Sequence, residues 1–195
     1  MRIVVALTGA SGQIYGIRLL EYLNKTDVET HLIISPAAKE NIEIETEYSV
    51  DYVEGLADFC YDYMDFTAPI ASGSFKHDGM IVIPCSIKTA SAIANSFSYN
   101  LIIRAADVTL KEKRKLVLVV RETPLHSGHL RMLAKLSDLG AIIYPPVPAF
   151  YSKPRSLDDI VNHTVGRALD LLGVENDLYK PWMGRESISE KEFNL

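Results

Sequence analysis

The sequence predicts a single α/β domain, built as a three-layer sandwich with a mostly parallel sheet. Two observations favour this fold: short, continuously apolar segments alternate with longer segments of helical period, and no internal repeat or domain boundary interrupts them. Continuously apolar strands are typical of a sheet that helices cover on both faces. The 195 residues, of which 48% are hydrophobic and 23% charged, suffice for one globular domain with a substantial core.

The expected strands are five short apolar segments, each followed closely by glycine, proline or polar residues. They span residues 3–7, 30–34, 80–83, 116–120 and 141–144. Segments of helical period lie between or after them, at 13–23, 86–96, 100–114, 128–139 and 157–172. This alternation is typical of a Rossmann-like (flavodoxin-like) fold.

The segment 157–172 has the clearest helical pattern. Its apolar residues recur every three or four positions, Ser156 precedes it as an N-cap, and Gly173 ends it. The periodic pattern is lost soon afterwards. We therefore expect a domain at 1–174 and an extension at 175–195 that completes the active site or the contacts of an oligomer.

The composition excludes several classes of protein. A formal net charge of -5 argues against a generic nucleic-acid binder. Two cysteines, Cys60 and Cys85, are too few for a disulfide scaffold or a thiolate zinc site. No apolar stretch reaches membrane-spanning length and no signal peptide is apparent, so we expect a cytoplasmic protein without membrane contact. His126, His129 and His163 make no zinc motif, and we expect these residues to cap or pack, with no metal bound.

The first strand is followed by a glycine-serine turn at 9–12. Glycines allow close approach of a ligand to the backbone, and the amides of the following helix favour an anion. The turn matches neither the dinucleotide motif nor the P-loop. Because the second strand ends in Ser35 rather than in an acid that would hold a ribose, the pattern favours a mononucleotide or phosphate. A plain tight turn remains the alternative.

The strand at 80–83 is followed by a second candidate anion site. Ser86 is placed to cap the next helix, while Lys88 and Thr89 lie in its first turn, where a cation and backbone amides meet. Cys85 has no base beside it in the sequence. We interpret it as a buried core thiol rather than a nucleophile.

Charged residues supply further candidates. Arg104 and Lys111 share one helix face with Asp107 between them, and a salt-bridged surface explains this spacing better than a binding role. Arg121 and Glu122 end a strand, where such a pair can bind a ligand and move a proton. An ordinary exposed ion pair is the alternative for these two residues.

Arg167 is unusual because it lies seven residues after Ile160, toward the apolar face of its helix. An arginine at such a position needs a partner, since an unpaired buried charge is costly. A carboxylate or a phosphate could fill that role, and the planar guanidinium suits a phosphate.

Six segments together resemble the flavin prenyltransferases, the UbiX family. They are TGASGQIYGIRLL, DFTAPIASGSF, PCSIKTASAIA, RAADVTLKEKRKLVLVVRETPLH, PPVPAFYSKP and KPWMG, and they cover nearly the whole chain. The resemblance implies that the domain binds FMN and joins its N5 and C6 atoms to a dimethylallyl group taken from dimethylallyl phosphate, without a metal. It also implies a homododecamer with sites shared between subunits, and a UbiD-type decarboxylase as recipient of the prenylated FMN.

The resemblance also implies roles for individual residues. FMN binding is implied for Gly9, Ala10, Ser11, Ser35, Ser86, Ile87, Lys88, Thr89 and Arg121. Binding of dimethylallyl phosphate is implied for Tyr151, Arg167 and Lys111. Catalytic roles are implied for Glu122, Lys111, Arg104 and Trp182. Phe75 falls where the family has an aromatic residue in the pocket wall, often tryptophan.

Two other functions compete with this one. The first is an FMN-dependent decarboxylase of the homo-oligomeric flavin-containing cysteine decarboxylase type, which uses a PxMNxxMW-type block that PCSIKT does not match. The second is a flavin carrier without catalysis. That function would leave Glu122, Lys111, Tyr151 and Arg167 without a common purpose.

Overall fold

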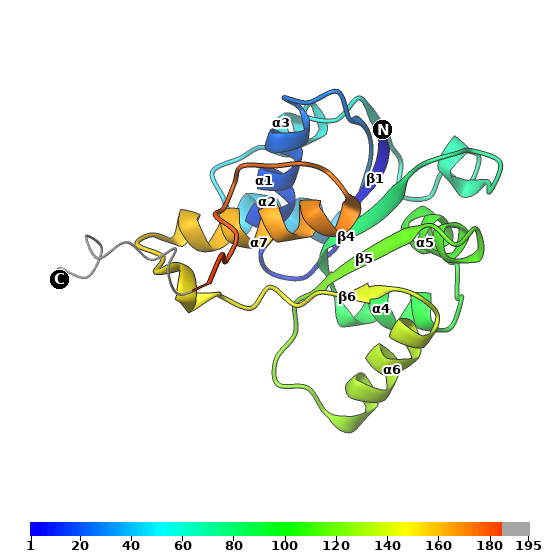
Figure 1. Cartoon of the computed structure of the whole chain (residues 1–195). Helices are drawn as coiled ribbons and strands as arrows, with labels where there is room; N and C mark the ends of the chain where they lie inside the picture. Colours follow the sequence, from blue (N-terminus) through cyan, green and yellow to red (C-terminus); the bar gives the residue numbers. More distant parts are fainter. Residues whose placement is uncertain (185–195) are drawn as a thin grey trace, which may run out of the picture.

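The computed structural model describes residues 1–184, so that residues 185–195 of the expected extension lie outside the described part. A parallel sheet of six strands forms the centre, in the order β3-β2-β1-β4-β5-β6 (Figure 1). The strands are β1 (Arg2–Leu7), β2 (Glu29–Ile34), β3 (Phe59–Tyr61), β4 (Gly79–Cys85), β5 (Lys115–Val120) and β6 (Ile142–Ile143). The predicted parallel α/β sheet is confirmed.

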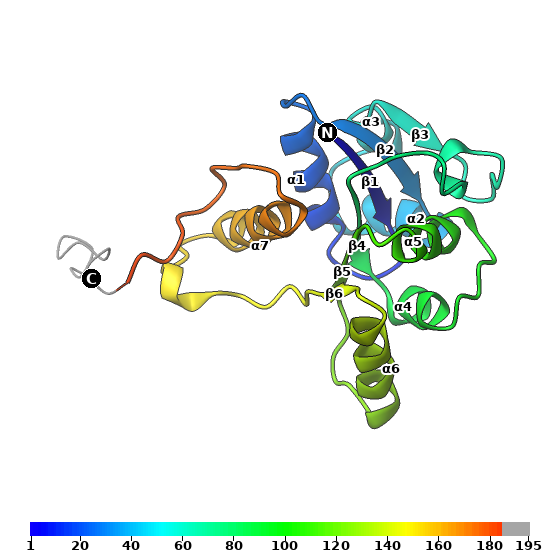
Figure 2. The same cartoon turned by 45° about the vertical axis from the view of Figure 1, so that its right-hand side comes forward.

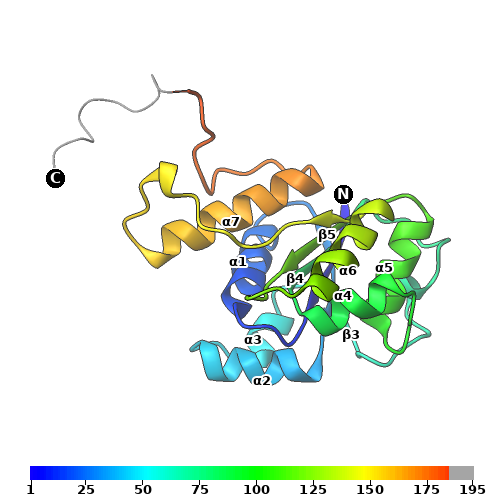
Figure 3. The same cartoon turned by 90° about the horizontal axis from the view of Figure 1, so that it is seen from below.

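Helices cover both faces of this sheet (Figure 3). One face carries α1 (Gln13–Leu23), α2 (Pro36–Glu45), α3 (Val50–Glu54) and α7 (Leu157–Leu172), and the other carries α4 (Ile87–Ala94), α5 (Leu101–Lys111) and α6 (Ser127–Asp138). Each face has its own apolar core, because successive side chains of a strand point to opposite sides. In β1, for example, Val4 belongs to one core and Val5 to the other, and both are fully buried. The three-layer prediction is therefore confirmed.

Two helices match their predicted bounds, and local signals explain why. Helix α7 begins with a capping box, in which Ser156 Oγ accepts from the Asp159 amide and the Asp159 carboxylate accepts from the Ser156 amide. It ends at Gly173, whose φ of 85° suits a residue without a side chain. Helix α1 begins after Gly12, which has a φ of 100°.

The sequence prediction missed α2, α3 and the edge strand β3. Pro36 looked like a stop signal after β2, but it occupies the first position of α2, where its fixed φ and missing N–H are favourable. Ser35 caps this helix by accepting from the Ala38 amide at 3.2 Å. None of the helices within residues 1–184 is long and apolar enough to cross a bilayer.

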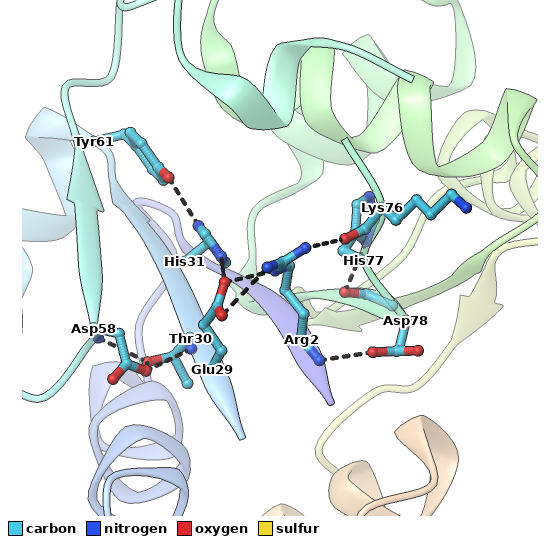
Figure 4. Close-up of polar contacts among 10 residues, drawn as sticks. Arg2, Glu29, Thr30, His31, Asp58, Tyr61, Lys76, His77 and Asp78 are labelled. Carbon is cyan, nitrogen blue, oxygen red and sulfur yellow. Dashed lines mark hydrogen bonds and ion pairs between the residues drawn. The ribbon is translucent and has the colours of Figure 1, made fainter. Parts of the chain in front are cut away.

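A cluster of hydrogen-bonded polar side chains lies at the sheet edge where β1 and β2 begin (Figure 4). The buried His31 imidazole lies 2.8 Å from the Tyr61 hydroxyl and 2.8 Å from Glu29 Oε1. Arg2 Nε donates to the same Glu29 oxygen at 2.5 Å. Hydrogen bonds from Arg2 and then from His31 lower the pKa of Glu29 to about 2. These polar groups therefore form hydrogen bonds with one another. In open α/β sheets, ligands bind at the other edge, beyond the carboxyl ends of the strands.

That opposite edge contains the point where the strand order reverses, between β1 and β4. The chain after β1 leads to α1 on one face, and the chain after β4 leads to α4 on the other face (Figure 3). A crevice for a ligand opens at such a point in open α/β sheets. The fold thus places the two predicted anion-binding turns side by side.

Candidate active site

The turns after β1 and β4 are joined by the buried side chain of Thr8. Its hydroxyl donates to the Pro84 carbonyl at 2.8 Å and accepts from the Ser86 amide at 2.8 Å. The Thr8 amide also donates to the Pro84 carbonyl, at 3.2 Å. One side chain therefore holds two loops that are 76 residues apart in the sequence.

The glycine-serine turn is close to α2, and hydrogen bonds from the Gln13 side chain fix its backbone. A Cβ atom added at Gly9 would lie 2.6 Å from the Ala37 Cβ, so glycine is required there by a close approach. Gln13 Nε2 donates to the carbonyls of Thr8 and Ala10, each at 2.8 Å. Gln13 is fully buried, and sequence reasoning did not single it out.

The amino end of α1 holds a carboxylate. Glu45 Oε2, from the end of α2, accepts from the Gly12 amide at 2.8 Å and from the Gln13 amide at 3.1 Å. This contact supports the expectation that the turn favours an anion, because helix amides and the helix dipole both attract negative charge. Glu45 was missed because it belongs to the unpredicted α2, and its contact with residues 33 positions away leaves no local pattern.

The amino end of α4 presents hydroxyl groups and a cation at the same edge. Ser86 Oγ accepts from the Thr89 amide at 3.3 Å and lies 3.1 Å from Thr89 Oγ1, which confirms the predicted cap. Ile87 packs against the core, and Lys88 Nζ lies 5.9 Å from the centre of the Tyr99 ring. With α1 and α2, this helix brings three helix amino ends to the carboxyl edge of adjacent strands.

Arg121 and Glu122 follow β5 and are exposed. The Arg121 amide donates to the Cys85 carbonyl at 3.1 Å, which places it beside the turn after β4. Burial raises the pKa of the Tyr15 phenol, and the positive charge of Arg121 opposes that shift, so Arg121 also lies close to α1. Glu122 Oε1 accepts from the Thr123 amide at 3.0 Å. The backbone contact thus places Arg121, with Glu122 next to it in the chain, beside the turn after β4, and their roles in binding and proton transfer stay predictions.

A second cluster surrounds a cavity of about 380 Å³ between η2 (Phe150–Ser152), α7 and the chain after α7. Figure 2 shows the segment from β6 to η2 reaching away from the sheet toward the start of α7. The rings of Tyr151 and Trp182 meet edge-on at 5.6 Å, and both line the cavity. The Tyr151 hydroxyl lies 3.1 Å from Nε2 of His163, which also lines it.

Arg167 differs from its expected position. Its side chain is 44% exposed rather than buried, because Gly166 and Ala168 occupy the buried face of α7 at this level. Its Nη1 donates to Asp170 Oδ2 at 2.9 Å and to the Tyr179 hydroxyl at 3.2 Å. A carboxylate is therefore one partner of the Arg167 guanidinium, and binding of a phosphate stays a prediction. The hydrogen bond with Tyr179 contributes most to raising the pKa of Arg167, so the guanidinium stays charged.

Three predicted residues lie apart from both clusters. Arg104 and Lys111 are on α5, across the sheet from α7 (Figures 1 and 3). Arg104 Nε donates to the Ala71 carbonyl at 3.0 Å and pairs with Asp107 at 3.5 Å, whereas Lys111 pairs with its neighbour Glu112. Phe75 packs at the opposite sheet edge, where the Arg2 guanidinium lies 4.6 Å from its ring centre. Within one subunit, these three residues therefore lie away from Tyr151.

The remaining candidates have structural roles. Cys85 is fully buried, and burial raises the pKa of its thiol to about 12, which confirms the core interpretation. His126 caps α6 by accepting at Nδ1 from the amides of Gly128 and His129. Within residues 1–184, no three His, Cys, Asp or Glu side chains gather as metal ligands would.

A flavoprotein family model matches residues 1–169 of the chain. The flavin prenyltransferase UbiX of Thauera aromatica is 56% identical over 186 residues, which are 95% of this chain and 96% of the relative. The flavin prenyltransferase UbiX of Archaeoglobus fulgidus is 58% identical over 182 residues, which are 93% of this chain and 100% of the relative. The chain belongs to the flavin prenyltransferase family.

Solved structures agree with membership of the flavin prenyltransferases. A UbiX protein crystallised with FMN and dimethylallyl pyrophosphate has a TM-score of 0.92 and 50% identity, covering 94% of this chain and 97% of its own. A dodecameric, FMN-dependent UbiX-like decarboxylase from Escherichia coli O157:H7 has the same TM-score and identity, covering 94% and 100%. The peptidyl-cysteine decarboxylase EpiD, with a TM-score of 0.61 and 18% identity over 88% of this chain and 97% of its own, shares only the fold.

Proposed function

We propose that this flavin prenyltransferase joins a dimethylallyl group from dimethylallyl phosphate to N5 and C6 of reduced FMN. One observation carries the proposal: three helix amino ends meet at the carboxyl edge of the sheet, and a separate cluster on and around α7 holds the Arg167 guanidinium and a cavity lined by Tyr151. Each of these two regions would bind one phosphate group. A transferase that uses a nucleotide and an allylic phosphate has to bind two phosphate groups. A flavin carrier would need only the first region.

The residues at the strand-order reversal fit FMN. Ser35 and Ser86 offer hydroxyls at helix amino ends, and the first amides of α4 have no acceptor within their own helix. Gly9, Ala10 and Ser11 would hold FMN from the α1 side, where Gly9 leaves no space for a larger residue. Ile87, Lys88, Thr89 and Arg121 would complete this binding region. When bound, reduced FMN supplies the nucleophilic N5 and C6 atoms.

Tyr151 and Arg167 would hold the phosphate of the donor, with Lys111 as a further cation. Cleavage of the allylic C–O bond leaves a phosphate, whose negative charge these cations stabilise. Arg167 already shares its charge with Asp170, so a phosphate would compete for, or add to, that ion pair. The aromatic ring of Trp182 would pack beside the allylic carbon chain and keep water away from the positive charge that develops there.

Glu122 would take the proton that is lost when the new ring closes. Its carboxylate follows β5, next to Arg121 at the FMN edge, and is solvent-exposed before ligands bind. The departing phosphate would be the other acceptor for this proton. Arg104 would act from a neighbouring subunit.

The positions of the cations support an assembly in which subunits share sites. Arg104 and Lys111 lie across the sheet from Tyr151 and Arg167, so a second copy has to supply them if both pairs serve one donor. We infer a homododecamer in which the domain at 1–174 binds FMN and the extension at 175–195 completes the site. We also propose a cytoplasmic location and delivery of the product to a UbiD-type decarboxylase.

Incubation of the purified protein with reduced FMN and dimethylallyl phosphate, under anaerobic conditions, tests the proposal. Mass spectrometry should show a flavin heavier by one C5H8 unit. Recovery of unmodified FMN alone would contradict it. A mixture of Lys111→Met and Arg167→Met subunits, each inactive by itself, should regain partial activity if one site takes both residues from different copies.

A further inference from the structure

The hydroxyl of Tyr151 has a protein partner in His163. The His163 Nε2 atom lies 3.1 Å from the Tyr151 oxygen, and the two residues come from different elements, η2 and α7. His163 also lies one helical turn before Arg167, so the imidazole and the guanidinium are on the same side of α7. His163 therefore contacts one residue of the proposed donor site, Tyr151, and shares a helix face with the other, Arg167.

Neighbouring rings fix the orientation of the imidazole. The Tyr151 ring meets it edge-on at 5.7 Å, and the Tyr179 ring does so at 4.9 Å. Burial, followed by the positive charge of Arg167, lowers the pKa of His163, so the ring is neutral near pH 7 and carries a single N–H. Among the described residues, Asp159, Lys153, Arg155 and Lys180 face the same cavity.

The direction of the hydrogen bond follows from the chemistry of a phosphate. The oxygens of a phosphate dianion only accept hydrogen bonds, whereas a tyrosine hydroxyl has one hydrogen to donate. If Tyr151 donates to His163, it has no hydrogen left for the donor phosphate. If His163 Nε2 carries its proton, it donates to the Tyr151 oxygen and leaves the hydroxyl hydrogen free.

We propose that His163 is a positioning residue, whose Nε2–H donates to the Tyr151 oxygen and thereby turns the Tyr151 hydroxyl hydrogen toward the phosphate of the allylic donor. The inference rests on the proposed function, in which Tyr151 binds that phosphate. Arg167 is oriented separately, by Asp170 and Tyr179. Loss of the imidazole should therefore weaken the Tyr151 contact and leave the Arg167 contact in place.

Two substitutions separate the hydrogen bond from the packing. His163→Phe keeps a ring against Tyr151 and Tyr179 but removes the N–H. His163→Gln gives up the ring and keeps an amide N–H at a similar reach. Trp182 is the one tryptophan of the chain and contacts the Tyr151 ring, so its fluorescence reports binding without any turnover.

The test is a fluorescence titration of the full-length protein with dimethylallyl phosphate, and with inorganic phosphate as a second probe, in a phosphate-free buffer. His163→Phe should raise the dissociation constant of both probes about five- to tenfold, as expected for one lost hydrogen bond, while FMN binding stays unchanged. His163→Gln should bind both probes nearly as tightly as the wild type. In a Tyr151→Phe background, His163→Phe should have no further effect.

Equal dissociation constants for the wild type and His163→Phe would overturn the proposal. So would equal losses in the phenylalanine and glutamine variants, or a loss that persists without the Tyr151 hydroxyl. A wild type that binds dimethylallyl phosphate but forms no prenylated FMN would refute the proposed function instead, while the binding curves still decide the role of His163.

Discussion

The close approach of Gly9 to Ala37 gives a quantitative prediction for the glycine-serine turn at 9–12, which we propose binds FMN. In Gly9→Ala, the new Cβ atom would lie 2.6 Å from the Ala37 Cβ, whereas ordinary contacts begin near 3.4 Å. The turn or α2 has to move by almost 1 Å, and overpacking of this kind costs about 1–3 kcal/mol. We expect the free energy of unfolding to fall by that amount, and FMN binding to weaken because the turn shifts.

The compensating change is Ala37→Gly. Without the Ala37 Cβ, the nearest atoms to the new Cβ at Gly9 are backbone carbons of residue 37 at 3.6 and 3.7 Å, which is ordinary contact. Ala37→Gly alone should cost about 0.5–1 kcal/mol, as glycine does in a helix.

Urea unfolding of the wild type, both single variants and the double variant measures the coupling between the two positions. We expect the double variant to be about 1–2 kcal/mol more stable than the sum of the single effects predicts. The FMN affinity of the double variant, followed by quenching of flavin fluorescence, should likewise be higher than that of Gly9→Ala alone. Strict additivity would refute the steric reasoning.

Three further predictions concern the active site, a buried histidine and a helix cap. Glu122→Gln should bind FMN with wild-type affinity and form prenylated FMN slowly, and wild-type rates by mass spectrometry would remove the carboxylate from the mechanism. Burial, followed by Arg114, lowers the pKa of His77 to about 4, so the unfolded chain binds a proton below about pH 6.5 that the native protein does not. Stability should therefore fall with decreasing pH between those values, by about 2 kcal/mol near pH 5, and this contribution should be missing from the urea unfolding of His77→Gln. Ser156→Ala should lower the free energy of unfolding by about 1 kcal/mol through loss of the α7 cap, with Ser137→Ala on α6 as a control that leaves it nearly unchanged.

The parts of the fold that the sequence predicted correctly depend on local signals. Helix α7 carries its own cap, apolar period and terminal glycine, so its bounds could be predicted without tertiary contacts. Helix α2 could not be placed in this way, because a proline after a strand is compatible with either a stop or a helix start. The two-residue strand β6 was expected to be twice as long, since an apolar sequence does not show where strand pairing ends.

In the candidate site, too, the residues with local signals could be predicted and those that depend on tertiary contacts could not. Ser86 and Cys85 could be interpreted from their neighbours in the sequence, and the structure agrees. The contact of Glu45 with the α1 amides and that of His163 with Tyr151 join segments that only the fold brings together. Arg167 was misplaced because helical periodicity alone does not show that the buried face of α7 is narrower at Gly166.

The Thr8 hydroxyl has a consequence for the order of events during folding. It joins the first strand to a strand that begins more than 70 residues later, and both belong to the middle of the sheet. Contacts so distant along the chain form only after a large loop has closed, and the closure of such loops slows folding. A nascent chain released before β4 is made therefore lacks one of the two turns that we propose bind FMN. Capture of FMN by a newly synthesised chain would mark the moment when its central strands have paired.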